Sequence, residues 1–111
     1  MPLFDERKKS AERKFEHDRE LAFKITARRN KLLGLWAAAH LGLTGEKAER
    51  YAREIVETEV TGHGEAAVIA RICTDFAASG FPMTEQEVRR RLDVFRVEAR
   101  NAVMRGTEEQ R

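Results

Sequence analysis

Apolar residues recur at helical spacing along most of the chain, and no stretch shows the alternation expected of a strand. The longest such pattern runs from about Phe4 to Leu41, contains no proline, and has Gly34 as its only glycine. Its recurring apolar residues are Leu21, Ile25, Leu32, Leu35, Trp36 and Ala39. Gly42 follows as a C-terminal stop signal. The pattern therefore predicts one long helix over about residues 4–41.

Three shorter helices are predicted after this one. Thr44 is a good N-cap, and the Gly-His-Gly triplet at 62–64 breaks the chain after the second helix. A third helix is expected over 65–79, and a fourth begins at Thr84, where Thr84 and Glu87 have the spacing of a capping box. The predicted inner face of the second helix consists of Ala48, Tyr51, Ala52 and Ile55, and that of the third helix consists of Val68, Ile69, Ile72 and Phe76. The predicted inner face of the fourth helix consists of Val88, Leu92, Phe95, Ala99 and Ala102 or Val103. Short connections between amphipathic helices predict an all-α, antiparallel four-helix bundle.

The first twenty residues carry a different pattern. Basic and acidic residues balance between Asp5 and Glu20, and one narrow helical stripe holds Phe4, Ala11, Phe15 and Ala22. At about 100° per residue, this stripe is rotated by roughly 80° from the one formed downstream by Leu21, Ile25, Leu32 and Trp36. We therefore expect two surfaces, one that folds the bundle and one that lies in the groove of a partner protein.

These patterns divide the chain into an N-terminal arm at 1–19, a helical bundle at 20–105 and a frayed polar tail at 106–111. The arm holds like-charged i,i+4 pairs at Glu12/Glu16 and Glu16/Glu20, which repel each other on a helix. A helix of about 15 residues is marginal in water on its own. The arm is accordingly predicted to be mobile or weakly helical when the protein is free.

Composition narrows the classes of function and partner. A chain of 111 residues fits one domain, and a net charge of +2 does not favour nucleic acid or a membrane surface as a partner. The single cysteine excludes an internal disulfide, and no run approaches the roughly 18 apolar residues of a membrane span. The charged N-terminus also lacks an apolar signal core. We expect a cytoplasmic protein with no direct insertion into a membrane.

The sequence offers no constellation for an enzyme. It has no phosphate loop, no Cys/His metal spacing and no nucleophile elbow, so catalytic and metal-binding functions rank last. The acidic residues Glu54, Glu57 and Glu59 are interpreted as helix-surface charges.

A cluster of cations suggests an alternative function. Arg28, Arg29 and Lys31 lie near Trp36, where they could hold a phosphate while a base stacks on the indole. The commoner reading is a solvated face with Trp36 in the core, and the same choice applies to the cations at 89–91. The alternatives to an inhibitor are thus a small bundle that binds an adenine nucleotide or another anion, and a helical adaptor for another complex.

The block FKITARRNKLLGLWAA at 23–38 resembles the zeta subunit family, the ATPase inhibitors of alphaproteobacterial F-type ATP synthases. The resemblance covers nearly the whole chain. Upstream it includes Phe4, Asp5, Arg7, Glu12, Lys14, Phe15, His17, Asp18, Glu20 and Leu21. Downstream it includes Leu41-Gly42-Leu43, Tyr51-Ala52, Asp75-Phe76, Gly80 and Val88-Arg89-Arg90.

The resemblance implies a four-helix bundle whose N-terminal segment is inhibitory. That segment would enter the interface between the catalytic subunits and the central rotor as a long helix, blocking rotation in the direction of ATP hydrolysis and impeding synthesis much less. The partner-binding residues would be Phe4, Arg7, Lys8, Ala11, Glu12, Lys14, Phe15, Asp18 and Arg19. The partner would be the catalytic sector of ATP synthase, which would hold the protein at the inner membrane. When it is free, the protein would be a monomer. No cofactor would be required, although an interaction with adenine nucleotides is also implied.

Two arm residues depart from the family pattern. An aromatic residue is usual where Ala11 stands, and a glutamate is usual where Lys8 stands. Ala11 narrows the apolar stripe at its middle, and Lys8 reverses a charge. The resemblance therefore implies weaker inhibition than that of a member with the aromatic residue, while the fold is unaffected.

Overall fold

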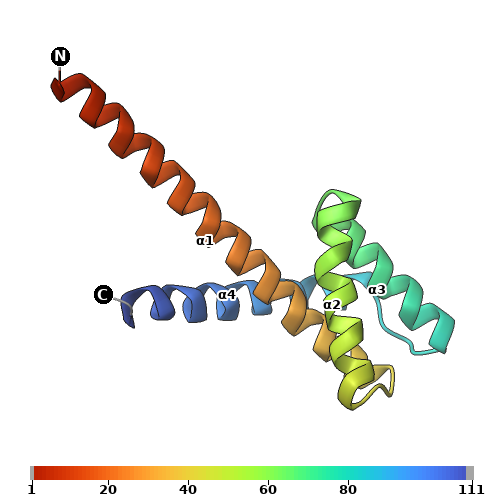
Figure 1. Ribbon diagram of the computed structural model, residues 1–111. Helices are drawn as coiled ribbons and strands as arrows, with labels where there is room; N and C mark the ends of the chain where they lie inside the picture. The colour runs from red at the N-terminus through yellow and green to blue at the C-terminus, as the bar shows by residue number, and fades with distance from the viewer. Residues whose placement is uncertain (1, 110–111) are drawn as a thin grey trace.

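The computed structural model describes the backbone of residues 2–109 and the side chains of residues 7–106. It contains four α-helices over the described residues and no strand (Figure 1). They are α1 (Pro2–His40), α2 (Gly45–Gly62), α3 (Glu65–Ser79) and α4 (Glu85–Glu109). The predicted all-α fold with four helices is therefore confirmed.

Helix α1 packs mainly against α2 and α4, α3 packs against the same two helices, and α1 and α3 also touch each other. The N-terminal half of α1 projects away from the other helices, as Figure 1 shows. This projection gives the molecule its elongated dimensions of 65 × 28 × 23 Å. No described helix is long and apolar enough to cross a membrane.

The hydrophobic core lies where the four helices meet. Its buried side chains are Leu33, Ala37 and Ala38 from α1, Tyr51 and Ile55 from α2, Val68, Ile69, Ile72 and Phe76 from α3, and Val88 and Leu92 from α4. The predicted inner faces of α2 and α3 match this list closely. On α4, Val88, Leu92 and Ala99 are buried, whereas Phe95, Ala102 and Val103 are half-buried.

The apolar face predicted for α1 is not the face that the structure buries. Every described member of that stripe is only half-buried except Ala39, which is exposed. The buried residues are instead Arg29, Asn30, Leu33, Gly34, Ala37 and Ala38. Residues 32–39 are apolar or small around the whole helix circumference, so their pattern does not indicate which side faces the core.

A local capping signal explains the start of α4. The backbone N–H of Glu87 donates to Thr84 Oγ1 at 3.2 Å, which confirms that Thr84 caps α4. Thr44 precedes α2 as predicted, but its side chain makes no capping hydrogen bond. Helix α4 continues past Gly106 to Glu109, so the described part of the predicted tail is helical. Fraying of this last turn stays a prediction, and residues 110–111 lie outside the described residues.

A half-buried polar network joins α2 to α3. The Tyr51 hydroxyl donates to Asp75 Oδ2 at 2.7 Å, and Arg71 Nε donates to the same oxygen at 2.8 Å. Arg71 also reaches Glu54 Oε2, at 3.1 Å. Burial, followed by the hydrogen bond to Asp75, raises the pKa of Tyr51 far above its ordinary value. The phenol therefore stays protonated and acts as the donor.

Gly34 lies where α1 and α2 approach each other closely. A Cβ atom added at this position would lie 2.7 Å from the Cα atom of Ala52, which is backbone and cannot rotate away. Ile55 Cβ would be 3.3 Å from the added atom. The absence of a side chain at Gly34 therefore sets the spacing of these two helices.

Replacing Gly34 with alanine should destabilise the fold, because the helices would have to separate. We expect Gly34→Ala to lower the free energy of unfolding by about 1–3 kcal/mol, the range typical of overpacking. Urea denaturation followed by circular dichroism measures this change. Gly106→Ala is the matched control, because a Cβ there meets nothing within 4 Å. It should be neutral or stabilise by up to about 1 kcal/mol, and a Gly34→Ala variant as stable as this control would contradict the packing argument.

Candidate functional site

The described side chains of the N-terminal arm make no contribution to the core. Every described side chain from Arg7 to Glu20 is exposed, and Phe15 keeps 64% of its surface accessible. The Arg19 guanidinium lies 5.8 Å from the centre of the Phe15 ring, within the range of a cation–π contact. This exposure agrees with the hypothesis that the arm stripe and the folding surface are separate. The Phe4 side chain lies outside the described ones.

Several of the predicted partner-binding residues share one face of the arm. Lys8, Ala11, Glu12, Phe15 and Arg19 border a single shallow hollow together with Glu16. The remaining candidates with described side chains, Arg7, Lys14 and Asp18, are exposed on the same helix outside that hollow. No ion pair joins the side chains described between residues 7 and 20, so their charges remain available to a partner.

Arm and bundle belong to one uninterrupted helix. Helix α1 runs from Pro2 to His40, so the predicted boundary between residues 19 and 20 is a change in burial and not a break in the helix. Leu21 is the first half-buried residue, and Arg29 is the first buried one among those described. The population of helix in the free arm in solution stays a prediction.

The predicted nucleotide cluster is not assembled in the structure. Arg28 and Lys31 are exposed on the outer face of α1, whereas Arg29 is buried at 5% exposure. Successive helical residues differ by about 100° in direction, so adjacent arginines face different surroundings. Trp36 packs edge-on against His40 and Phe76, with ring centres 5.0 and 5.9 Å away, and does not line the hollow beside Arg28 and Lys31. The four residues therefore do not form one phosphate-and-base site.

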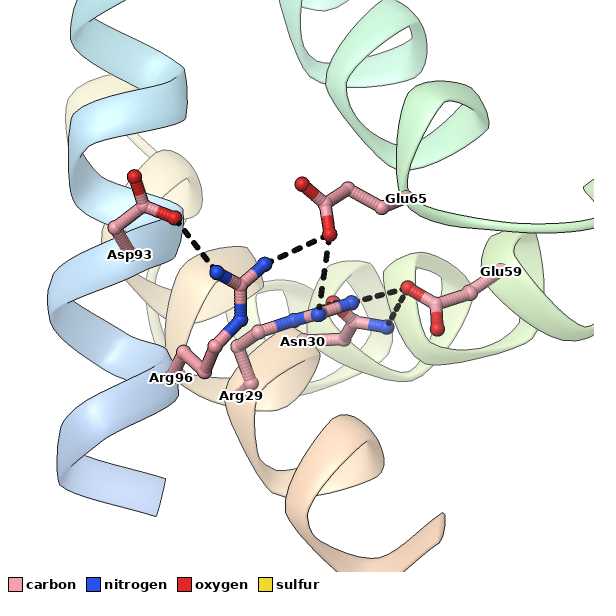
Figure 2. A network of polar contacts seen from close by, with 6 residues as sticks. All are labelled: Arg29, Asn30, Glu59, Glu65, Asp93 and Arg96. Atoms are coloured by element: carbon pink, nitrogen blue, oxygen red, sulfur yellow. Dashed lines mark hydrogen bonds and ion pairs between the residues drawn. The ribbon is translucent and has the colours of Figure 1, made fainter. Parts of the chain in front are cut away.

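The Arg29 guanidinium instead lies at the centre of a polar network (Figure 2). It forms an ion pair with Glu59 of α2, and its Nε and Nη2 atoms donate to Asn30 Oδ1 at 3.1 and 3.0 Å. Asn30 Nδ2 in turn donates to Glu59 Oε1 at 3.1 Å. Glu65 Oε2, on α3, is 3.6 Å from Arg29 Nη1.

The network extends to the fourth helix through Glu65. Arg96 Nη2 contacts Glu65 Oε2 at 2.7 Å, and Arg96 Nη1 contacts Asp93 at 2.9 Å. Side chains from α1, α2, α3 and α4 are thereby joined in one connected set, as Figure 2 shows. No buried side-chain nitrogen or oxygen among the described residues lacks a hydrogen-bond partner. We call this set the Arg29 network: Arg29, Asn30, Glu59, Glu65, Asp93 and Arg96.

The interpretation of Glu59 as a surface charge was wrong, because this carboxylate is paired with the buried Arg29. The partners are 30 residues apart, so helical periodicity carries no signal of the pair. Arg29 and Asn30 lie within the polar run Arg28-Arg29-Asn30-Lys31, so the local sequence does not mark them as buried. Metal ligation receives no support in the described part of the chain, where no three His, Cys, Asp or Glu side chains gather to hold an ion.

Removing the charge of Arg29 should destabilise the bundle, because Glu59 would be left without its cation. We expect Arg29→Met to lower the free energy of unfolding by about 3 kcal/mol in urea denaturation. The matched control is Arg89→Met, which removes an exposed pair with Glu85 and should change stability by about 0.5 kcal/mol or less. Introducing Glu59→Gln into the Arg29→Met variant should lower the free energy of unfolding by less than the same substitution does in the natural chain. Equal losses of stability for Arg29→Met and Arg89→Met would show that the network does not hold the helices together.

A comparison with known protein families places the chain. The family described as ATPase inhibitor subunit zeta matches residues 1–102, which include the arm and most of the bundle. A search of curated proteins finds no match. Because the family match spans nearly the whole chain, the protein belongs to the ATPase inhibitor subunit zeta family.

Proposed function

We propose that this protein inhibits ATP hydrolysis by an F-type ATP synthase, and that its N-terminal arm is the inhibitory element. The arm would enter the interface between the catalytic subunits and the central rotor as a helix and obstruct rotation in the hydrolysis direction. The observation that supports this proposal is the exposure of every described arm side chain on a helix that projects from the bundle (Figure 1). Such a surface has no role within the protein's own fold.

The geometry of α1 suits insertion. At about 1.5 Å per residue, the segment from Pro2 to Glu20 spans roughly 28 Å, enough to reach into a subunit interface from outside. The helix is continuous with residues that the bundle buries, so the bundle provides a fixed base for the arm. A rod held at its base transmits a steric block better than a free peptide does.

The energetics of insertion are favourable in outline. Ordering an arm on binding costs on the order of 2–5 kcal/mol. Burial of Phe15 and Phe4 would return roughly 1.5–3 kcal/mol each. Arg7 and Lys14 would add charge-assisted hydrogen bonds to carboxylates of the partner. Because no ion pair occupies Arg7 or Lys14 among the described side chains, these contacts would not require an existing pair to break.

The alternative function, binding of an adenine nucleotide or anion by the bundle, has less support. Of its four predicted residues, Arg29 is committed to Glu59 and Trp36 to an aromatic cluster. Only Arg28 and Lys31 share a surface. Inhibition through the arm is therefore the function that we propose.

Deleting residues 1–19 should abolish inhibition of ATP hydrolysis by the catalytic sector, because the obstructing helix is gone. The Arg29 network lies outside the deletion, so the remaining chain should retain its helical circular dichroism and cooperative melting.

A single Phe15→Ala substitution in the full chain should weaken inhibition by about tenfold or more through lost apolar burial. Val97→Ala, another exposed apolar truncation, is the control and should inhibit normally. Inhibition that survives the deletion would place the activity in the bundle.

Restoring an aromatic side chain at position 11 should strengthen inhibition. Ala11→Phe widens the apolar stripe next to Phe15, and one additional buried ring should lower the inhibitory concentration by about tenfold. Ser10→Phe is the matched control, because it adds the same ring about 100° away around the helix. Equal inhibition by the Ala11→Phe variant and the natural chain would mean that this stripe does not face the partner.

A further inference from the structure

A basic groove lies on the outer face of α1, at the base of the arm. Its hollow has a volume of about 650 Å³ and is bordered by residues of three helices. The cations Lys24, Arg28 and Lys31 follow its length, and the apolar side chains around them include Phe23, Leu32 and Leu35 from α1, Val56 from α2 and Val103 from α4. Helices α2 and α4 both pack against α1, so they form the two sides of the groove.

The three cations are arranged in a line and have no ion-pair partner among the described side chains. Their spacings of four and three residues place them along one edge of α1, over about 10 Å. None of the three forms an ion pair or a side-chain hydrogen bond with a described residue, and no carboxylate lines the hollow. The groove therefore presents positive charge that no described side chain pairs with.

The same groove exposes an apolar surface that continues into the arm. Phe23 keeps 65% of its surface accessible. Together with Lys24 it also borders the next hollow, which contains Glu16, Arg19 and Glu20. Glu16 and Arg19 in turn border the hollow around Phe15. The proposed inhibitory surface and the groove are thus one continuous surface along α1.

We infer that the basic groove docks an acidic amphipathic helix of the same ATPase that the arm inhibits, an inference that rests on the proposed function. A helix with carboxylates at i, i+4 and i+7 would match the linear spacing of the cations, and its apolar side chains would cover Phe23, Leu35 and Val56. A shallow hollow lined by three helices suits this mode of recognition. Docking there would hold the base of the arm while its tip enters the partner.

The arrangement suits a helix better than a nucleotide or a membrane. Phosphate recognition needs donors that converge on one group, whereas these cations are spread along a line. No unpaired buried polar side chain points into the groove from the described residues. An anionic membrane would repel Glu16 and Glu20, which lie on the adjoining surface.

Charge reversal in the full-length chain tests the inference. The variant Lys24→Glu/Arg28→Glu/Lys31→Glu is compared with Lys47→Glu/Arg50→Glu/Arg53→Glu, which reverses three exposed cations of α2 that have no ion-pair partner among the described residues. Binding to the isolated catalytic sector is measured by biolayer interferometry, and folding is checked by thermal melting. We expect the groove variant to raise Kd by about tenfold or more and the control to change it by about twofold or less. Equal Kd values for the two variants would overturn the inference.

Two further readouts separate this inference from the proposed function. A natural chain that neither binds nor inhibits the catalytic sector would refute the proposed function and the groove with it. A natural chain that inhibits normally, combined with a groove variant that binds as tightly as the control, would refute the groove alone. The neutral variant Lys24→Gln/Arg28→Gln/Lys31→Gln should give an intermediate Kd, since it removes attraction without adding repulsion.

Cross-linking identifies the occupant. A benzoylphenylalanine placed at position 31 is irradiated in the complex with membrane-bound ATP synthase, and the cross-linked peptides are sequenced by mass spectrometry. Cross-links to an acidic helical segment of the ATPase would support the inference. Cross-links confined to lipid, or loss of the protein cross-link when millimolar ADP competes at constant ionic strength, would overturn it in favour of a membrane or a nucleotide.

Discussion

The buried charge of Arg29 restricts how the other helices can be arranged. The charge of an arginine that is only 5% exposed must be neutralised and hydrogen-bonded within the protein, because an unpaired buried charge is strongly destabilising. Glu59 and Glu65 meet this requirement from either side of the turn between α2 and α3. The position of that turn is therefore tied to one residue of α1. Through Glu65 and Arg96, the same requirement reaches α4.

A second constraint acts a short distance along α1. Gly34 brings the backbone of α1 against Ala52 of α2, and it lies about 7.5 Å along the helix from Arg29. Two fixed points on one straight helix determine its direction as well as its position. The direction in which the arm leaves the bundle is consequently set by buried residues. This is how a core feature can control the geometry of an exposed functional surface.

Much of the fold can be predicted from local sequence patterns, whereas the site depends on contacts between residues that are far apart in the sequence. The inner faces of α2 and α3 and the Thr84 cap follow from apolar spacing and capping chemistry. The phase of α1 does not, because residues 32–39 are apolar or small on every side. Helical periodicity depends on the positions of apolar residues, so it cannot distinguish the buried Arg29 from the exposed Arg28. That difference arises from a carboxylate 30 residues away.

The expectation of a weakly helical arm, which stays a prediction, depends on the bundle as well as on the arm's own sequence. Repulsion among Glu12, Glu16 and Glu20 bears on an isolated segment, which must also nucleate its own helix. In this chain the bundle already holds residues 29–38 as a helix, so the arm only has to extend it, and each added residue avoids the nucleation cost. The bundle thus favours helix in the segment that it presents.

Adjoining hollows along α1 continue the exposed surface of the arm to the bundle. Steps of four residues lead from Phe15 through Arg19 to Phe23 and Ala27, and each step turns the surface by about 40° around the helix. A partner that follows this ridge from the arm is carried toward the groove between α2 and α4. Because Ala11 offers little apolar area, the large exposed rings described on this ridge, Phe15 and Phe23, lie toward the bundle. Apolar contact with a partner should accordingly extend beyond the arm to Phe23, where α1 enters the bundle.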